Sequence, residues 1–511
     1  MKALGRGEMA ARAAPLVDTS RGGCFSAEMA TLARAARLFH TGLPRDGITP
    51  AFERLLRDSP PSGILLFRRD FVRLDRLEPL VRRLRSLAAP APLLVSVDEE
   101  GGFVSQLAPD VPVAPSARVL GRAASARQVE ALGEYTGRVL HAAGVDIDWA
   151  PVFDVDAETT NPVIGPRAFS PDPAVVGRLG VAFARGLMAG GVLSCAKHFP
   201  GHGETRADSH LVLPRSDTPR ERLEARDFPP FHAAVADRVP LVMVSHVHFA
   251  AFDAEPVPAT LSPVVSRDLL RQAFGFQGCA VTDAMEMKAV SGAYGAGPAA
   301  RRALEAGCDV LLYGAWTPET EEALRTVAAA LEEPAFAARV TQAERRLERL
   351  FDQRAAVAGH VGDAPAPQEP PLDLTTLCSR ALQLEGDAAA VRAASRARWL
   401  VVEPEWSAGP TLASLLAERG WQAEGASWES AAGVVDRHDH VLVAHARRVA
   451  PTPEEAALLA RAAGRPVSVL VAFGQDAFLR DHLRARLRVS AGDPGEPMRR
   501  AVAGRVTGPT V

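Results

Sequence analysis

Eight short apolar runs, separated by longer segments of helical periodicity, constrain this 511-residue chain more than any other feature. The intervening segments, such as 128–142 and 173–189, carry apolar residues at helical spacing. Continuous apolar strands that alternate with helices indicate a parallel sheet covered on both faces. The runs span residues 37–43, 63–67, 93–98, 145–150, 192–197, 241–246, 279–283 and 309–313.

Eight such strands predict an α/β fold of the (β/α)8 type, a TIM-type barrel, which needs about 250 residues. An open doubly wound sheet is the alternative that the pattern leaves. In a barrel, the chemistry gathers at the carboxyl ends of the strands, where the βα loops form the site. The residues found at the ends of the third, fifth, sixth and seventh runs are Asp98, Lys197, His198, His246 and Asp283.

The composition changes after the predicted barrel. Residues 355–372 are rich in Pro, Ala and Gly, which is typical of a linker. Beyond them, apolar runs at 399–402, 440–444 and 466–473 again alternate with helical segments. We therefore predict a catalytic barrel domain in 1–354, a linker in 355–372 and a smaller C-terminal α/β domain with a doubly wound sheet in 373–511.

Charge and targeting signals narrow the partners. A formal net charge of −3 gives no basic surface for nucleic acid or membrane lipid, so we expect neither as a partner. The N-terminal residues lack the apolar stretch of a signal peptide, which predicts a cytoplasmic protein. Five cysteines without a C-x-x-C pair are expected to be small buried hydrophobes. Monomer and homodimer both remain open.

The segment KHFPGHGETRADSH, residues 197–210, contains the densest group of reactive side chains. Lys197 and His198 at a strand end are donors suited to sugar hydroxyls. In an extended loop, residues two apart point the same way, so Asp208 can bond one nitrogen of His210 and leave the other for a substrate. This is the arrangement of an oriented imidazole base. The alternative is a solvated loop with a helix-capping Asp208 and an incidental histidine.

The segment FQGCAVTDAMEM, residues 276–287, places Asp283 directly after an apolar strand. An aspartate at the mouth of a barrel is well sited as a carboxylate nucleophile. The alternative is an N-cap for the next helix. Met285 and Met287 offer apolar surface for a pyranose ring or an acetyl methyl.

Three further segments suit a sugar site. VDEEGG, residues 97–102, places Asp98 before a glycine turn, where it can accept hydrogen bonds from hydroxyls. NPVIGPRAF, residues 161–169, places Arg167 in a long loop over the same mouth, and SHVHF, residues 245–249, holds His246 and His248.

Together these motifs resemble glycoside hydrolase family 3, and within it the β-N-acetylglucosaminidase (NagZ-like) branch. The resemblance rests on KHFPGHG…DSH, NPVIGPRAF, PATLSP (258–263) and GFQGCAVTDAM (275–285), and covers about residues 35–350. It implies that Asp283 is the nucleophile, His210 the acid/base and Asp208 its orienting partner. It further implies a set of sugar-binding or pocket-lining positions: Asp98, Arg167, Lys197, His198, His246, Met287 and Gln106.

The chain departs from the family pattern in three places. The family often has arginines where this chain has Phe103 and Gln106, and the second of these arginines often helps to bind the sugar. The expected contribution of Gln106 to hydroxyl recognition is therefore in doubt. The C-terminal domain is also shorter than in many two-domain relatives.

The implied activity is that of a retaining exo-β-N-acetylhexosaminidase, acting on peptidoglycan fragments (muropeptides) or chitin-type oligosaccharides and needing neither a cofactor nor a metal. Three alternatives stay open. An imidazole does not repel phosphate, so the same residues allow a β-N-acetylglucosaminide phosphorylase. A barrel metallohydrolase is possible because several histidines lie near Asp283. A non-catalytic muropeptide-binding protein is the third.

Overall fold

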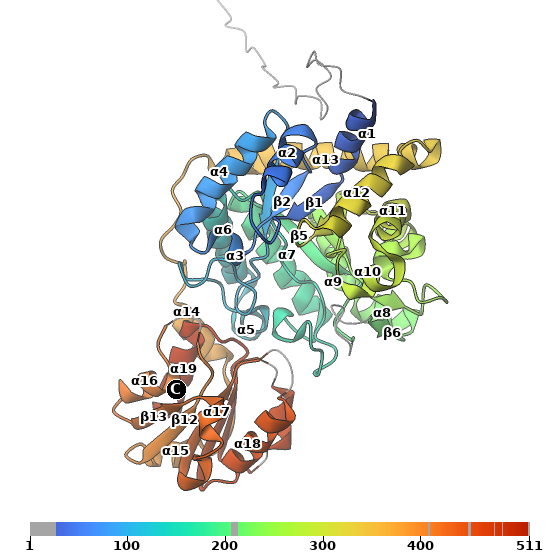
Figure 1. Ribbon diagram of the computed structural model, residues 1–511. Coiled ribbons are helices and arrows are strands. Elements are labelled where there is room, and N and C mark those ends of the chain that lie inside the picture. The colour runs from blue at the N-terminus through green and yellow to red at the C-terminus, as the bar shows by residue number, and fades with distance from the viewer. Residues whose placement is uncertain are drawn as a thin grey trace, which may run out of the picture.

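Parallel strands form a barrel in the N-terminal part of this chain (Figure 1). The structure is a computed structural model that describes residues 27–205, 213–406, 409–447, 451–474, 476–482 and 484–508. All eight strands expected from the apolar runs are present. They are β1 (Phe39–Gly42), β2 (Gly63–Leu65), β3 (Leu94–Val97), β4 (Ile147–Asp148), β5 (Leu193–Phe199), β7 (Leu241–Val244), β9 (Cys279–Thr282) and β10 (Leu311–Tyr313).

The strand order β10-β1-β2-β3-β4-β5-β7-β9 follows the chain around the ring, and every neighbouring pair is parallel. A parallel bridge between Val281 and Val310 joins the two ends, and the Thr282 amide donates to the Val310 carbonyl at 3.0 Å. The prediction of a (β/α)8 barrel is therefore confirmed, and the open doubly wound sheet is wrong for this part of the chain.

Helices cover the outside of the barrel because each strand is followed by an amphipathic segment. The larger ones are α1 (Ala27–Ala36), α2 (Pro50–Asp58), α4 (Leu77–Ala88), α6 (Ala126–Ala142), α7 (Pro173–Ala189), α8 (Arg220–Arg226), α9 (Phe228–Ala236), the π-helix η4 (Val264–Ala273), α11 (Ala296–Ala306), α12 (Pro318–Ala330) and α13 (Pro334–Val361). Short elements in the loops are α3 (Arg68–Phe71), η1 (Leu74–Arg76), α5 (Ala117–Ala123), η2 (Gly165–Arg167), η3 (Ala259–Leu261), α10 (Lys288–Tyr294) and the two-residue strands β6 (Arg215–Ser216) and β8 (His248–Phe249).

Glycines bring α6 and α7 unusually close together. A Cβ on Gly186 of α7 would lie 2.2 Å from the Glu130 carbonyl of α6, and one on Gly137 would lie 2.6 Å from the Leu187 carbonyl. Ser125 caps α6 and Asp172 caps α7 through their side chains. The two helices thus hold the connections before β4 and β5, whose carboxyl ends bear candidate site residues.

The linker is shorter than its composition indicated. We expected it to begin at residue 355, but α13 continues to Val361. The reason is that the alanine-rich stretch has a high helix propensity and contains no proline before Pro365. Gly362, with φ of 60°, ends the helix.

The C-terminal domain is an α/β unit around a six-stranded sheet, ordered β11-β16-β15-β14-β12-β13. Its five parallel strands run in the doubly wound order 2-1-3-4-5, as predicted. The strands are β11 (Gln383–Gly386, antiparallel), β12 (Arg398–Val402), β13 (Gln422–Ala426), β14 (His440–His445), β15 (Val467–Ala472) and β16 (Leu487–Ser490). The helices are α14 (Leu374–Ala381), α15 (Ala388–Ala393), α16 (Leu412–Ala417), α17 (Trp428–Ala431), η5 (Val435–Arg437), α18 (Pro453–Ala463), η6 (Ala477–Asp481) and α19 (Glu496–Thr507).

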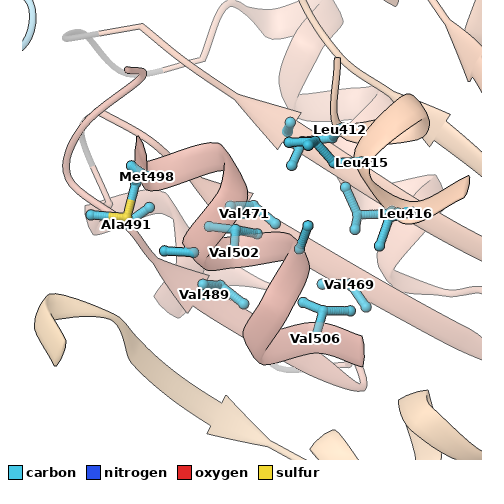
Figure 2. Packing of buried hydrophobic residues seen from close by; sticks show 14 of the residues in the cluster. Leu412, Leu415, Leu416, Val469, Val471, Val489, Ala491, Met498, Val502 and Val506 are labelled. Carbon is cyan, nitrogen blue, oxygen red and sulfur yellow. The ribbon is translucent and has the colours of Figure 1, made fainter. Parts of the chain in front are cut away.

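Apolar side chains cover both faces of this second sheet. On one face, α16 and α19 pack against β15 and β16 in the cluster drawn in Figure 2. On the other face, α18 and η5 pack against the alternate residues of β14 and β15, such as Val443 and Leu470. The domain therefore has a hydrophobic core of its own, to which Val119 of the barrel also contributes.

Cysteines and helix lengths agree with the expectations as far as they are described. Cys195, Cys279, Cys308 and Cys378 are buried and free, which confirms their assignment as small core residues; Cys24 lies outside the described residues. Among the helices of the described ranges, none combines the length and apolar character that spanning a membrane requires.

A buried carboxylate ties the base of the barrel together. Asp309, just before β10, is fully buried and accepts a hydrogen bond from the Ala280 amide of β9 at 3.0 Å. Arg339 and Arg346 of α13 lie at 3.0 and 3.1 Å from its Oδ1, and Arg271 of η4 pairs with its Oδ2. One side chain therefore links two strands and two covering helices.

Replacing Asp309 tests this role. We expect Asp309→Ala to lower the free energy of unfolding of the barrel by about 3–5 kcal/mol, because it leaves buried guanidinium groups without their counter-charge. Differential scanning calorimetry measures the change. The matched control is Asp268→Ala, which removes an exposed aspartate paired with Arg267 and should cost no more than about 0.5 kcal/mol. Equal shifts for the two variants would contradict the assignment.

Candidate active site

Polar side chains from four βα connections meet at the carboxyl end of the barrel. Asp98 follows β3, and Arg167 lies in η2 after β4. Lys197 and His198 lie near the carboxyl end of β5, and Asp283 follows β9. The sequence placed all five at strand ends or in the loops above them, and the structure brings them to one mouth.

A network of four charged groups forms one side of this mouth. Lys197 Nζ lies 2.6 Å from Asp98 Oδ1 and 2.6 Å from Glu100 Oε1. Arg167 binds Glu100 with two hydrogen bonds, from Nε to Oε2 at 2.8 Å and from Nη2 to Oε1 at 2.7 Å. The Glu100 side chain is only 6% exposed, so the pairing is shielded from solvent.

The network fixes the charges of its members. Burial alone would raise the pKa of Glu100, but Arg167 and Lys197 lower it well below the usual range. Burial alone would lower the pKa of Lys197, but Asp98 and Glu100 raise it above its ordinary value. Both groups are therefore ionised at neutral pH, and the mouth presents fixed cationic donors beside the Asp98 carboxylate.

Glu100 was not among the residues predicted from the sequence. It lies in the VDEEGG segment, two positions after Asp98, so its spacing would have allowed it to point the same way. Its partners, Arg167 and Lys197, lie 67 and 97 positions further along the chain. No local pattern specifies that pairing.

His198 is oriented by a second buried carboxylate that the sequence did not indicate. Its Nδ1 lies 2.7 Å from Asp154 Oδ2, and Asp154 is fully buried. The opposite nitrogen, Nε2, lies 3.4 Å from Arg167 Nη2. Because a guanidinium only donates, this contact is a hydrogen bond only in the tautomer that carries the proton on Nδ1.

Asp154 also holds the following turn in place. Its Oδ1 accepts a hydrogen bond from the His202 amide at 2.6 Å. Burial alone would raise the pKa of Asp154, but His198 and His202 lower it below the ordinary value. The ionised carboxylate thus fixes His198 and the start of the loop after β5.

Asp283 is the carboxylate that faces these groups. Burial alone would raise its pKa, but His198, His246 and the Ala284 amide lower it below the ordinary value. The Ala284 amide donates to Oδ1 at 2.8 Å. Asp283 is therefore an ionised carboxylate at neutral pH, as a nucleophile must be.

His246 supports Asp283 from below. The His246 ring is fully buried, and its Nε2 donates to the Ala284 carbonyl at 3.0 Å while Nδ1 lies 2.7 Å from Thr260 Oγ1. Both ring nitrogens are thus engaged with the protein. This arrangement fixes the peptide next to Asp283. The pocket-lining role expected for His246 stays a prediction, as does that of the nearly buried Met287.

Gln106 connects two loops of the mouth. Its Oε1 accepts a hydrogen bond from the Arg68 amide at 2.7 Å, and its Nε2 donates to the Asp98 carbonyl at 3.2 Å. The side chain therefore braces the backbone of Asp98. Direct contact of Gln106 with a sugar stays a prediction.

The predicted acid/base pair, Asp208 and His210, lies outside the described residues, in the gap between 205 and 213. The chain enters that gap from a well-held turn. His202 Nδ1 lies 2.7 Å from Thr205 Oγ1, and Asn161 Nδ2 donates to the His202 carbonyl at 2.9 Å. The turn lies beside His198, whose ring centroid is 5.9 Å from that of His202.

The histidines of the described ranges do not form a metal site. No group of three or more His, Cys, Asp or Glu side chains within the described ranges is arranged to hold a metal ion. The nitrogens of His246 are bonded to Thr260 and Ala284, and Nδ1 of His198 is bonded to Asp154. A metal ion could therefore recruit His246 only if its contact with Thr260 or with Ala284 were broken.

Comparison with known proteins agrees with this geometry. The model of the glycosyl hydrolase family 3 N-terminal domain matches residues 47–350. The chain belongs to glycosyl hydrolase family 3. It is a glycoside hydrolase, as the sequence motifs predicted.

Similar proteins cover either the barrel or the whole chain. A β-hexosaminidase from Neisseria gonorrhoeae (strain ATCC 700825 / FA 1090) is 37% identical over 272 residues, 52% of this chain and 74% of that protein. One from Chromobacterium violaceum is 39% identical over 287 residues, 54% and 78% of the two chains.

Solved structures extend the likeness to the second domain. A family 3 β-N-acetylglucosaminidase from Paenibacillus sp. str. FPU-7 superposes with a TM-score of 0.84 at 29% identity, over 93% of this chain and 96% of that one. A family 3 member from Mycobacterium smegmatis str. MC2 155 matches 64% of this chain and 98% of its own, with a TM-score of 0.57 at 34% identity. The family therefore includes chains of little more than barrel length.

Glu100 gives a direct test of the charged network. Both of its oxygens accept hydrogen bonds, so the amide group of Glu100→Gln would face a guanidinium or an ammonium donor. We expect kcat/KM on an aryl N-acetylglucosaminide to fall about 100-fold, because Arg167 and Lys197 lose their fixed positions. Steady-state kinetics measures the change.

The control for this variant is Glu134→Gln on α6. Glu134 is a partly exposed residue paired with Arg138, and its replacement should leave kcat/KM within about twofold of wild type. A similarly small effect of Glu100→Gln would mean that the network does not support the active site.

Proposed function

We propose that this chain is a retaining exo-β-N-acetylhexosaminidase that removes terminal β-linked N-acetylglucosamine. The observation that supports this most strongly is the ionised Asp283 after β9, at the same end of the barrel as the buried network that holds Arg167 and Lys197. Names of the relatives agree with it, since they are β-hexosaminidases and a β-N-acetylglucosaminidase.

In the first step, an oxygen of Asp283 attacks the anomeric carbon and the bond to the leaving oxygen breaks. Oδ1 accepts a hydrogen bond from the Ala284 amide, so we assign the attack to Oδ2. His210 gives its proton to the leaving oxygen. The product of this step is a covalent glycosyl-Asp283 and the free aglycone.

In the second step, water attacks the same carbon from the side that the aglycone has left. His210 takes a proton from the water, and the bond to Asp283 breaks. Two inversions give net retention of configuration. Asp208 orients His210 and stabilises its charged form, as the aspartate does in a Ser-His-Asp triad.

The charged network suits the sugar half of this reaction. Asp98 is the more exposed of the two acidic residues in the network, with 24% of its side chain exposed. Its second oxygen can accept a hydrogen bond from a sugar hydroxyl. Arg167 and Lys197 supply donors that need no reorganisation when the sugar arrives. We therefore assign Asp98, Arg167, Lys197 and His198 to the innermost sugar subsite.

The proposed substrates are peptidoglycan fragments or chitin-type oligosaccharides, met in the cytoplasm. Support for this range comes from the resemblance to the NagZ-like branch, since the described residues define only the innermost sugar. Phosphorolysis is the alternative outcome, because a histidine base does not repel an anionic acceptor.

Product analysis on a defined disaccharide tests the proposal. We expect wild type to release the β-anomer of N-acetylglucosamine first and to turn over at the same rate with and without inorganic phosphate. His210→Ala should lose about 100-fold more in glycosylation rate on the disaccharide than on an activated aryl glycoside, whose leaving group needs little protonation. Anomer-resolved NMR and rapid-quench kinetics give both quantities.

An exposed histidine on α13, His360, provides the control, and His360→Ala should behave as wild type. A sugar-1-phosphate product would replace hydrolysis by phosphorolysis. Equal losses of His210→Ala on the two substrates would remove His210 as the acid, and release of the α-anomer would overturn the retaining mechanism.

A further inference from the structure

The short helix α5 lies between the two domains, although it belongs to the loop after β3. Figure 1 places it beside α14 at the junction of the barrel with the C-terminal unit. Val119 of α5 is part of the core cluster of the C-terminal domain. Ala117 and Leu120, from the same helix, pack in a cluster of the barrel. The helix is therefore shared by both cores.

Asp493 of the C-terminal domain fixes the start of α5. The carboxylate is 3% exposed, and its Oδ2 accepts a hydrogen bond from the Ser116 amide at 2.5 Å. Ser116 Oγ in turn donates to the Gly492 carbonyl at 2.7 Å. The Gly495 amide donates to the other carboxylate oxygen at 2.7 Å. The residue preceding α5 is thus bonded to the C-terminal domain at two atoms.

Arg118 of α5 lies between carboxylates of both domains. Its Nη2 bonds Asp156 of the barrel at 2.8 Å, and its Nη1 lies 3.5 Å from Asp476 of the C-terminal domain. The Arg118 side chain is 8% exposed. Arg122, one turn later, also reaches Asp476, at 3.3 Å. Because these pairs are largely buried, screening by salt weakens them little.

All these anchors lie at one edge of the second sheet. Asp476 follows β15, Ser490 is the last residue of β16, and Gly492 and Asp493 follow that strand. In doubly wound sheets this is the edge at which ligands bind. Here the barrel's own helix and loop lie against it. Phe103, which stands where the family often has arginine, extends the contact, since a Cβ on Gly474 would lie 3.1 Å from its ring.

On its other side α5 supports the charged network of the active site. Ala117 and Leu120 line a cavity of about 10 Å³ together with Glu100, Arg167 and Phe169, too small for more than one water molecule. A Cβ on Gly121 would lie 1.7 Å from the Phe169 carbonyl, so the helix touches the loop that bears Arg167. A shift of α5 would therefore move that loop.

We infer that the C-terminal domain positions the sugar-binding Arg167 and its partner Glu100 through α5, with Asp493 and Arg118 as the positioning residues. The inference rests on the proposed function, because it takes the network as the sugar subsite. It gives the second domain a role in substrate binding without any direct contact with the sugar.

The test compares KM, kcat and the Kd of N-acetylglucosamine in the full-length enzyme. Asp493→Ala and Arg118→Met should each raise KM and Kd about tenfold and lower kcat by no more than about threefold, since the nucleophile keeps its own supports. Gly121→Ala perturbs the same contact from the barrel side without removing an interdomain bond. It should give the same pattern.

The control is Leu459→Ala on α18, which weakens the core on the opposite face of the second sheet and leaves α5 untouched. Its KM and Kd should stay within about twofold of wild type. Where Asp493→Ala does not fold, Asp493→Asn retains one acceptor and should show a smaller rise in the same two quantities.

Two outcomes are separable. If the wild-type enzyme neither binds N-acetylglucosamine nor cleaves its glycosides, the proposed function is overturned. The positioning role alone would be overturned by a different result. In that case the wild-type enzyme binds the sugar, and the folded variants Asp493→Ala, Arg118→Met and Gly121→Ala have the same KM and Kd as Leu459→Ala.

Discussion

The buried carboxylate of Glu100 is the constraint on which the active site depends. It accepts hydrogen bonds from both Arg167 and Lys197, two cations that would otherwise repel each other at the barrel mouth. Each of the three groups would be costly to bury alone, and together they are charged and fixed. The geometry of the mouth therefore does not depend on a bound substrate to bring its donors together.

Around this centre, each reactive group is held by a second residue to which we assign no contact with the substrate. Asp154 orients His198, His246 fixes the peptide after Asp283, and Gln106 braces the backbone of Asp98. These supports come from loops after different strands. A parallel barrel makes this possible because all strand ends converge on one face.

The sequence was sufficient for the barrel and for the reactive ends of its strands. Continuous apolar runs that alternate with helices predict a covered parallel sheet, eight of them favour a closed barrel over an open doubly wound sheet, and Asp98, Lys197 and Asp283 end three of those runs. Glu100 and Asp154 escaped prediction because their roles depend on partners brought close only by folding. Their acidic segments also resemble ordinary turns. The linker was placed too early because composition does not show where an alanine-rich helix stops. The family motifs, rather than the periodicity, supplied the roles of His210 and Asp208.

The central claim is that Asp283 forms a covalent bond with the sugar. Trapping with a slowly released fluorinated N-acetylglucosaminide, followed by proteolysis and peptide mass spectrometry, measures this directly. The account predicts one adduct, with the mass of the glycosyl group, on the peptide containing Asp283, and no adduct on that peptide in Asp283→Asn. An adduct on another residue would contradict the account. So would turnover of the reagent without inactivation of the enzyme and with inversion of configuration in the product.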